Sequence, residues 1–397
     1  MSVPIKTIEQ TASRKITPLE SMRGIAAFVV FLFHFLLGFA PQYHGQEAAT
    51  AIPGSNLIET PFFFLINGSA AVTFFFVLSG FVLSYSYFSK GINDGLLVSV
   101  IKRWPRLFPL ALISVLISWM MIHYGLYSYT EAAQVTRSQW MSQFASSKGN
   151  FLELSFSDAF RQGFFYTFFR GDYNLNTSLW TMHYELIGSL LVFGLIPLLN
   201  GTSYKQALIL FVLFMVAAFY TSPYMCAFIM GCFLSYYRCQ VRPLMPVVHA
   251  SRVLLIIGLV VVILTFGYMD PARGFYSFMH QDSRELMQAV RILLHSLASV
   301  VLIQMILSYD GFYKLLDGRT GRFLGRCSFA LYVIHVPLMF TFSTAVFLAL
   351  LDTIGYPGSV IVTFVLTLPL LFLISWMMAK IDEFWCRRVN RTVKKMF

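Results

Sequence analysis

GIAAFVVFLFHFLLGFA, residues 24–40, is an apolar run whose one ionisable side chain is His34. A run of this length and composition predicts a helix that crosses a membrane. Hydrocarbon does not solvate an ionisable group, so such a group normally faces the protein interior or a water-filled cavity. Arg23 lies 11 residues before His34, which places both side chains on one helix face, roughly 16 Å apart along the axis. The pair predicts a polar path from the membrane edge to its middle, unless His34 only bonds a neighbouring helix.

The composition of the whole chain is that of an integral membrane protein. Of its 397 residues, 57% are hydrophobic and 12% are charged, whereas soluble proteins carry about a quarter charged residues. We therefore expect an all-α, polytopic bundle of about ten membrane-spanning helices. The predicted spans are residues 24–41, 64–88, 107–124, 179–198, 206–221, 224–237, 253–268, 287–308, 328–350 and 359–380.

The basic residues predict the orientation of this bundle. Most of the 29 Lys and Arg residues fall in segments that are cytoplasmic if both termini lie inside, as the positive-inside rule requires. The chain then divides into a cytoplasmic tail at 1–23, one membrane domain at 24–380 and a basic cytoplasmic tail at 381–397. This topology and anionic membrane lipids explain the net charge of +11, so we expect no nucleic-acid partner.

The external segments and the cysteines predict no further domain. Residues 42–60 are polar, with Pro and Gly that indicate irregular backbone. Residues 125–178 end in AFRQGFFYTFFRGDYN, whose closely spaced aromatic residues predict a segment in the plane of the membrane interface. The five cysteines include no C-x-x-C pair, which argues against a disulfide framework and against a metal site.

A basic motif, KRWPRLFPL at 102–110, precedes the third predicted span. Arg103 and Arg106 are spaced i,i+3 and so project to one side of a helix. Together with Lys102 they suit a phosphate-bearing ligand, such as the diphosphate of coenzyme A or a nucleotide, because guanidinium groups bind phosphate oxygens in pairs. The alternative is ordinary anchoring to lipid headgroups.

The fourth predicted span opens with NTSLWTMHYEL at 176–186. Glu185 is expected about two turns inside the outer boundary, where a carboxylate needs a partner or a cavity. His183 is two residues away and points elsewhere on a helix, so the two do not form a dyad. The alternative is a structural Glu185 paired with an arginine of another span.

Two further spans carry polar stripes. In GRCSFALYVIHVPL, residues 325–338, Ser328 is expected to cap the helix, and Tyr332 and His335 follow on one face. His335 would lie about 10 Å from the inner surface and could meet the Arg23–His34 face, or bond a backbone carbonyl. Span eight carries a second stripe that lines an acceptor vestibule or holds helices together. Its members are Gln288, Arg291, His295 and Ser299.

Five motifs together resemble the acyltransferase-3 family of membrane acyltransferases. LESMRGIAAFVVFLFH matches its Arg-x10-His signature at Arg23 and His34, and FFFVLSGF at 74–81 looks like its second-span block, whose Ser79 and Gly80 predict close helix packing. RWPRLFP resembles its R-x-x-R motif. SLWTMHYE is similar to its W-S-L-x-x-E element, with Thr181 and Met182 replacing the usual residues, and SFALYVIHVP resembles its closing block, with Phe329 where Tyr is common. The motifs occur in the family's order over residues 16 to about 340.

This resemblance implies an enzyme of the bacterial inner membrane that transfers an acyl group, most often acetyl. The donor would be cytoplasmic acyl-CoA, such as acetyl-CoA, and no metal is implied. The acceptor would be a sugar hydroxyl of a lipid-linked or cell-surface glycan, for example an O-antigen or an exopolysaccharide. The protein would complete the transfer itself or pass the acyl group to a separate extracytoplasmic acyltransferase.

The resemblance also implies roles for individual residues. His34 would deprotonate the acceptor hydroxyl or accept the acyl group, Arg23 would orient the donor or stabilise an oxyanion, and Glu185 would orient an imidazole or bind sugar hydroxyls. The donor phosphates would be held by Lys102, Arg103 and Arg106. Substrate contacts are expected from Trp180, Tyr332, His335, His295 and Arg291.

Two other functions fit a polar path through a membrane. A transporter or flippase of a glycolipid or small anion would move its substrate without covalent change. A non-catalytic scaffold would make the Arg-x10-His spacing incidental. Binding of acyl-CoA that depends on Arg103 and Arg106 distinguishes the enzyme from both.

Overall fold

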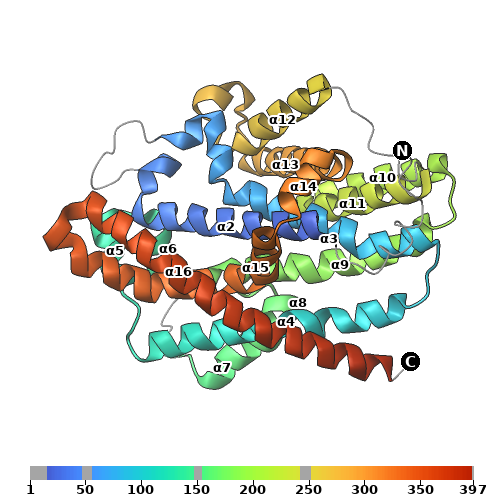
Figure 1. Ribbon diagram of the computed structural model, residues 1–397. Helices are drawn as coiled ribbons and strands as arrows, with labels where there is room; N and C mark the ends of the chain where they lie inside the picture. Colours follow the sequence, from blue (N-terminus) through green and yellow to red (C-terminus); the bar gives the residue numbers. More distant parts are fainter. Residues whose placement is uncertain (1–15, 47–55, 147–153, 242–251, 396–397) are drawn as a thin grey trace.

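The computed structural model describes residues 16–46, 56–146, 154–241 and 252–395, and every regular element in these ranges is a helix (Figure 1). The prediction of an all-α protein is confirmed. Predictions for residues 1–15 of the N-terminal tail and for residues 47–55 of the 42–60 segment lie outside the described residues.

Within the described ranges, seven helical segments are long and apolar enough to cross a membrane, which confirms a polytopic protein. They are α2 (Thr17–Phe39), α3 (Gly68–Lys90), α4 (Leu96–His123), η7 with α9 (Thr177–Leu179 and Trp180–Leu199), α10 (Tyr204–Thr221), α13 (Arg284–Ser308), and the run formed by α15 (Arg319–Leu338), η10 (Met339–Ser343) and α16 (Thr344–Lys394). The last run contains two predicted spans, which are separated at Gly355, where the backbone is not helical. Two predicted spans fall on shorter helices, α11 (Pro223–Tyr236) and α12 (Arg252–Gly267). The count of ten crossings stays a prediction.

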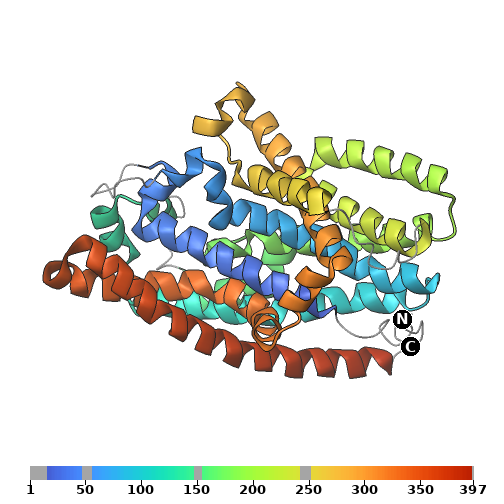
Figure 2. The same cartoon turned by 45° about the horizontal axis from the view of Figure 1, so that its top comes forward.

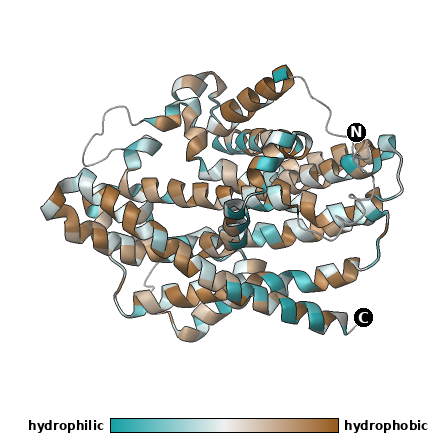
Figure 3. Cartoon of the chain, in the orientation of Figure 1, coloured by the Kyte–Doolittle hydropathy of each residue, from teal (hydrophilic) through white to brown (hydrophobic). Residues whose placement is uncertain are grey.

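Shorter elements join these helices. They are η2 (Pro41–His44), η3 (Leu57–Glu59), η4 (Pro61–Leu65), α5 (Tyr129–Thr136), α6 (Gln139–Ser146), α7 (Phe156–Arg161), η6 (Gln162–Tyr166), α8 (Thr167–Phe169), η8 (Tyr237–Val241), η9 (Gly274–Met279) and α14 (Asp310–Leu316). We call the end of the molecule where α2 begins and α3 ends the inner end, following the predicted orientation, and the opposite end the outer end. Figure 3 shows hydrophobic residues along most of the helices and hydrophilic ones gathered near the end of α16.

Close helix packing at glycines builds the centre of the bundle. A Cβ at Gly80 of α3 would collide with the backbone of Phe228 on α11, and one at Gly231 of α11 would collide with the Val77 carbonyl on α3. The same holds between α2 and α15, where Gly24 meets the backbone of Leu324. The predicted role of Gly80 in close packing is confirmed.

The segment before α9 does not lie in the membrane interface, so this prediction is wrong. It runs along α4 instead: the Trp119 indole donates a hydrogen bond to the Leu154 carbonyl (2.7 Å), and the Trp104 indole donates one to the Phe164 carbonyl (3.1 Å). These tryptophans are 15 residues apart on α4, roughly 22 Å along its axis. Aromatic side chains pack against α4 here, and η6 brings Gly163 into contact with Leu112. As a result, α9 begins inside the bundle.

Several helix ends differ from the predicted ones. Helix α2 begins at Thr17 and α16 continues to Lys394, so the parts of both predicted tails that are described are helical. Helix α15 begins at Arg319, nine residues before Ser328. The Ser328 hydroxyl therefore lies inside the helix and donates to the Gly325 carbonyl (2.8 Å), which corrects its predicted capping role.

Candidate active site

A carboxylate and a guanidinium group meet in the interior, between α3, α4 and α9. Glu185 forms an ion pair with Arg103, and the Ser79 hydroxyl donates a hydrogen bond of 2.8 Å to the same carboxylate oxygen. Ser79 is the middle residue of α3, so the pair lies roughly 17 Å from either end of that helix. The two charged side chains are only 12% and 14% exposed.

The depth of Glu185 corrects its predicted position near the outer boundary. Asn176, just before α9, is buried and donates to the Val333 carbonyl (2.7 Å) and to the Ser114 hydroxyl (3.1 Å). These bonds fix the start of α9 between α4 and α15, far below the outer end. The predicted alternative, an arginine partner on another helix, is confirmed for Glu185. A contact of Glu185 with substrate stays a prediction.

The predicted basic residues gather below this pair, toward the inner end. Arg103 lies within electrostatic reach of both Arg23 and Arg106, and we call these three residues the guanidinium cluster. Arg23 also pairs with Glu20 at 3.2 Å. Lys102 precedes Arg103 on α4.

Helix α16 supplies an acidic group to the guanidinium cluster that sequence reasoning missed. Asp382 lies within electrostatic reach of Arg106 and Arg23. The Trp385 indole donates to the Pro105 carbonyl (2.7 Å) and so fixes this part of α16 against α4. Asp382 was missed because its segment was assigned to a tail; the acidic pair at 382–383 inside a basic stretch is the signal that marks it.

Two histidines from α2 and α15 contact each other near the outer half of the bundle. His335 Nε2 lies 3.1 Å from His34 Nδ1. The sequence prediction that His335 meets the Arg23–His34 face is confirmed. Helix α15 begins at Arg319 and His335 follows 16 residues later, roughly 24 Å from the start of the helix; its depth below the inner membrane surface stays a prediction.

The hydrogen bonds of this histidine pair fix where its protons lie. His335 Nδ1 faces the Leu331 carbonyl at 3.3 Å, so it carries the proton and His335 Nε2 is an acceptor. His34 Nδ1 faces that acceptor and the Val30 carbonyl at 3.0 Å, so it must be the donor. The basic lone pair of neutral His34 is therefore on Nε2. His335 is fully buried, whereas His34 is half-buried.

Tyr332 links the two interior groups. It lies one turn before His335 on α15, and its hydroxyl is 2.9 Å from both the Ser178 carbonyl and the Thr181 hydroxyl at the start of α9. Glu185 lies within electrostatic reach of the same hydroxyl. Polar groups thus follow one another from the guanidinium cluster through Glu185 and Tyr332 to the histidine pair.

Aromatic side chains cover the histidine pair on its outer side. The Trp140 ring of α6 lies 5.1 Å from the His34 ring, and Phe33 lies edge-on at 5.3 Å. His44 of η2 is buried against Phe33, with ring centroids 4.8 Å apart. Sequence reasoning missed Trp140 and His44, since both come from segments outside the predicted spans.

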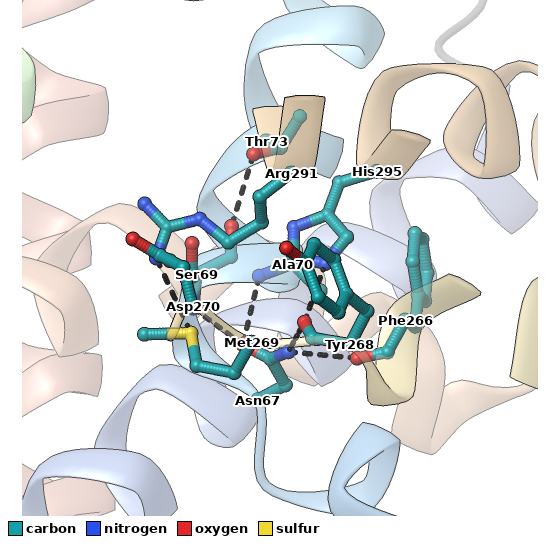
Figure 4. A network of polar contacts seen from close by, with 10 residues as sticks. All are labelled: Asn67, Ser69, Ala70, Thr73, Phe266, Tyr268, Met269, Asp270, Arg291 and His295. Carbon is teal, nitrogen blue, oxygen red and sulfur yellow. Dashed lines mark hydrogen bonds and ion pairs between the residues drawn. The ribbon is translucent and has the colours of Figure 1, made fainter. Parts of the chain in front are cut away.

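Three predicted substrate-binding residues lie apart from the histidine pair. Trp180 packs on Tyr224 of α11, with ring centroids 5.2 Å apart. Arg291 and His295 of α13 belong to a separate polar network (Figure 4). Arg291 forms an ion pair with Asp270, and His295 Nε2 lies 3.0 Å from the Tyr268 carbonyl.

The network of Figure 4 holds the chain after α12 against α3 and α13. Asn67 caps α3 by accepting from the backbone N–H groups of Ser69 (3.1 Å) and Ala70 (3.2 Å). Its amide also donates to the Phe266 carbonyl (2.7 Å) and the Tyr268 carbonyl (3.1 Å). These contacts give Arg291 and His295 the helix-joining role that the sequence left open. Substrate binding by them stays a prediction.

The protein-family model Acyl_transf_3, described as an acyltransferase domain, matches residues 17–377 of the chain. No curated protein and no solved structure matches it. The matched range contains the guanidinium cluster, Glu185 and both histidines, and it covers all five sequence motifs. The chain therefore belongs to the acyltransferase-3 family, and the protein is a membrane acyltransferase.

Proposed function

We propose that the protein transfers an acyl group, most often acetyl, from cytoplasmic acyl-CoA to a sugar hydroxyl of a lipid-linked or cell-surface glycan, in the bacterial inner membrane. The observation that carries this proposal is the contact between His34 and His335, with His34 on the same face of α2 as Arg23 of the guanidinium cluster. It combines a candidate general base with a second imidazole whose Nε2 lies 3.1 Å from His34 Nδ1. Acyl transfer to a hydroxyl needs such a base.

The guanidinium cluster supports acyl-CoA as the donor. Arg106 is exposed, and Arg23 and Arg103 lie close enough to act on the same anion. Coenzyme A carries its phosphates at one end and its thioester at the other. With the phosphates at Arg106, the extended pantetheine arm follows α2 toward His34, which is roughly 16 Å from Arg23 along the axis.

The proposed acyl transfer needs no reactant other than acyl-CoA and the acceptor hydroxyl. His34 Nε2 takes the proton of the acceptor hydroxyl while its oxygen attacks the thioester carbonyl. The carbon–sulfur bond then breaks, and the imidazolium returns the proton to the departing thiolate. During this step, His34 Nδ1–H donates to His335 Nε2, which stabilises the transient positive charge as the third member of a catalytic triad does. If His34 instead accepts the acyl group, the same nitrogen is the nucleophile.

Two measurements on the same set of variants test donor binding and acyl transfer separately. The purified protein in lipid nanodiscs is titrated with acetyl-CoA, and surface glycans of cells with and without the protein are compared by mass spectrometry. Arg106→Ala should weaken acetyl-CoA binding tenfold or more, since a hydrogen bond to a charged group contributes about 1.5–3 kcal/mol. His34→Ala should keep binding and lose acylation. Arg322→Ala, an exposed arginine at the inner end that pairs with Asp317, is the control.

The outcomes separate this proposal from a transporter. Wild-type acylation by His34→Ala, or unchanged binding by Arg106→Ala, contradicts the assigned roles. A glycan that crosses the membrane with no added acyl group, together with no binding of acetyl-CoA, would favour the transporter or flippase.

A further inference from the structure

A groove of about 510 Å³ opens between the turn that joins α10 to α11 and the first turns of α13. Its volume is that of a ligand site, roughly 300–1,000 Å³. The groove opens at the outer end of the molecule, because α10 ends and α13 begins there. Figure 2 shows α10 at the edge of the bundle, so the groove also borders the lipid-facing side.

The floor of the groove is formed by two tyrosines beside the candidate active site. Tyr184 of α9 and Tyr224 of α11 line it, with ring centroids 5.0 Å apart. Tyr184 directly precedes Glu185 in the chain. Tyr224 lies within electrostatic reach of Tyr332, one turn before His335. Tyr184 and Tyr224 thus stand between the groove and the polar groups that connect Glu185 to the histidine pair.

The wall behind Tyr224 is held in place by the network of Figure 4. Arg291 lies close to the Tyr224 hydroxyl, but its charge is paired with Asp270. Its guanidinium group also donates to the Met269 sulfur (3.3 Å). The arginine is therefore engaged by protein groups and supports the groove from behind.

The lining of the groove selects a neutral polyol rather than an anion. Its polar members are hydroxyl, amide and carboxylate groups, and no lysine or arginine lines it among the described residues. Phosphate sites need guanidinium or ammonium donors. Tyrosine offers an apolar ring face together with a hydroxyl, which matches the C–H faces and hydroxyls of a sugar. The lining residues that can contact a sugar are Tyr184, Tyr220, Tyr224, Glu285 and Gln288.

We propose that this groove binds a neutral saccharide and delivers one of its hydroxyls to the histidine pair. The sugar lies on Tyr184 and Tyr224 and bonds Gln288 and Glu285. An attached lipid chain leaves past Phe219 into the membrane. This inference rests on the proposed acyl transfer and adds to it the route and the charge of the acceptor.

The test fills the groove without touching the guanidinium cluster, Glu185 or the histidines. Ala289 lines the groove, and Ala289→Trp places an indole in it. Leu297→Trp is the matched control, because Leu297 lies on the same helix and is 53% exposed. Purified proteins in nanodiscs receive radiolabelled acetyl-CoA and a glycolipid extract of the cells. Ala289→Trp should keep acetyl-CoA affinity and lose at least tenfold in transfer, whereas Leu297→Trp keeps both.

If Ala289→Trp fails to fold, a smaller substitution and a competition assay test the groove assignment instead. Gln288→Leu should raise the KM for the glycolipid tenfold or more with little change in kcat. Octyl glucoside below its micelle concentration should compete with transfer, and octyl phosphate should not. Normal transfer by Ala289→Trp, an unchanged KM in Gln288→Leu, or competition by octyl phosphate alone overturns the groove assignment. Absence of both acetyl-CoA binding and transfer in the wild type overturns the proposed function instead.

Discussion

At the scale of single residues, the histidine pair divides the work between a base and a group that positions it. His335 is fully buried and its two nitrogens face a carbonyl and His34, so it does not reach a substrate itself. Its effect is to hold His34 Nδ1 protonated and therefore Nε2 basic. The tautomer is thus set by the Val30 carbonyl on the same helix together with His335 on another helix.

Removal of His335 is expected to lower kcat and leave the KM for acetyl-CoA unchanged. His335→Ala leaves His34 Nδ1–H with the Val30 carbonyl as its acceptor and removes the imidazole that would stabilise positive charge on His34, which should reduce kcat by about 10²-fold. His335→Gln restores an amide oxygen that accepts the same proton and should recover part of the loss. Steady-state kinetics of both variants checks this. Equal kcat values for the Ala and Gln variants would argue against a positioning role.

Removal of the Glu185 side chain is expected to destabilise the protein more than its replacement by the amide of the same shape, Glu185→Gln. Glu185→Ala leaves the Arg103 guanidinium buried without its partner, which costs about 3–5 kcal/mol. Glu185→Gln keeps an acceptor for the Ser79 hydroxyl and should cost less. Thermal unfolding in nanodiscs measures both. The double variant Arg103→Met/Glu185→Leu should regain stability but not activity; a double variant as unstable as Glu185→Ala would contradict this account.

At the scale of elements, the segment along α4 decides how deep α9 starts. Its aromatic residues suggested the membrane interface, and nothing in their spacing reveals that the chain turns inward. Asn176 is the residue that fixes this path, because one side chain joins α4, α15 and the start of α9.

Asn176→Ala is expected to loosen the start of α9 and shift Glu185. Buried groups on three elements lose a partner, so the cost should be about 1–3 kcal/mol in stability, together with a fall in kcat. The measurements are thermal unfolding and transfer rate. Leu198→Ala, at the other end of α9 and 47% exposed, is the control. A variant that keeps full kcat would show that this end of α9 does not position the site.

Close packing between α3 and α11 gives a second prediction for elements. Gly231→Ala should destabilise by about 1–3 kcal/mol, because its Cβ meets the α3 backbone. Gly194→Ala on α9 should not, since nothing lies within 4 Å of that position and alanine favours a helix. Thermal unfolding of the two variants compares them directly. Equal stability would mean that α3 and α11 separate without cost.

At the scale of the whole molecule, sequence reasoning predicted what depends on local composition. The apolar runs predicted the membrane-spanning helices, and the spacing of Arg23 and His34 predicted that both side chains lie on one face of the same helix. The depth of Glu185 was not predictable, because it depends on contacts between distant segments that fix the start of α9. The helical start of α15 was missed because its polar residues do not form an apolar run; Gly321 and Gly325 hold this part of the helix against Ser21 and Glu20 of α2.

The predicted orientation is tested by labelling of introduced cysteines. Glu131 is an exposed residue of α5 near the outer end, and Lys314 is an exposed residue of α14 near the inner end, so each is replaced by cysteine. A membrane-impermeant thiol reagent should label the first in intact cells and the second only after permeabilisation. The parent protein with its native cysteines is the control. The reverse pattern would place both termini outside.

The Arg103–Glu185 pair also bears on how a cell tolerates such a protein. A line of polar groups that joins two compartments threatens the ion gradient between them. Opposite charges that neutralise each other halfway, with Ser79 bound to the same oxygen, give a passing ion no unpaired charge to bind. The enzyme is thereby expected to admit a long anionic donor from one compartment while keeping the membrane electrically tight.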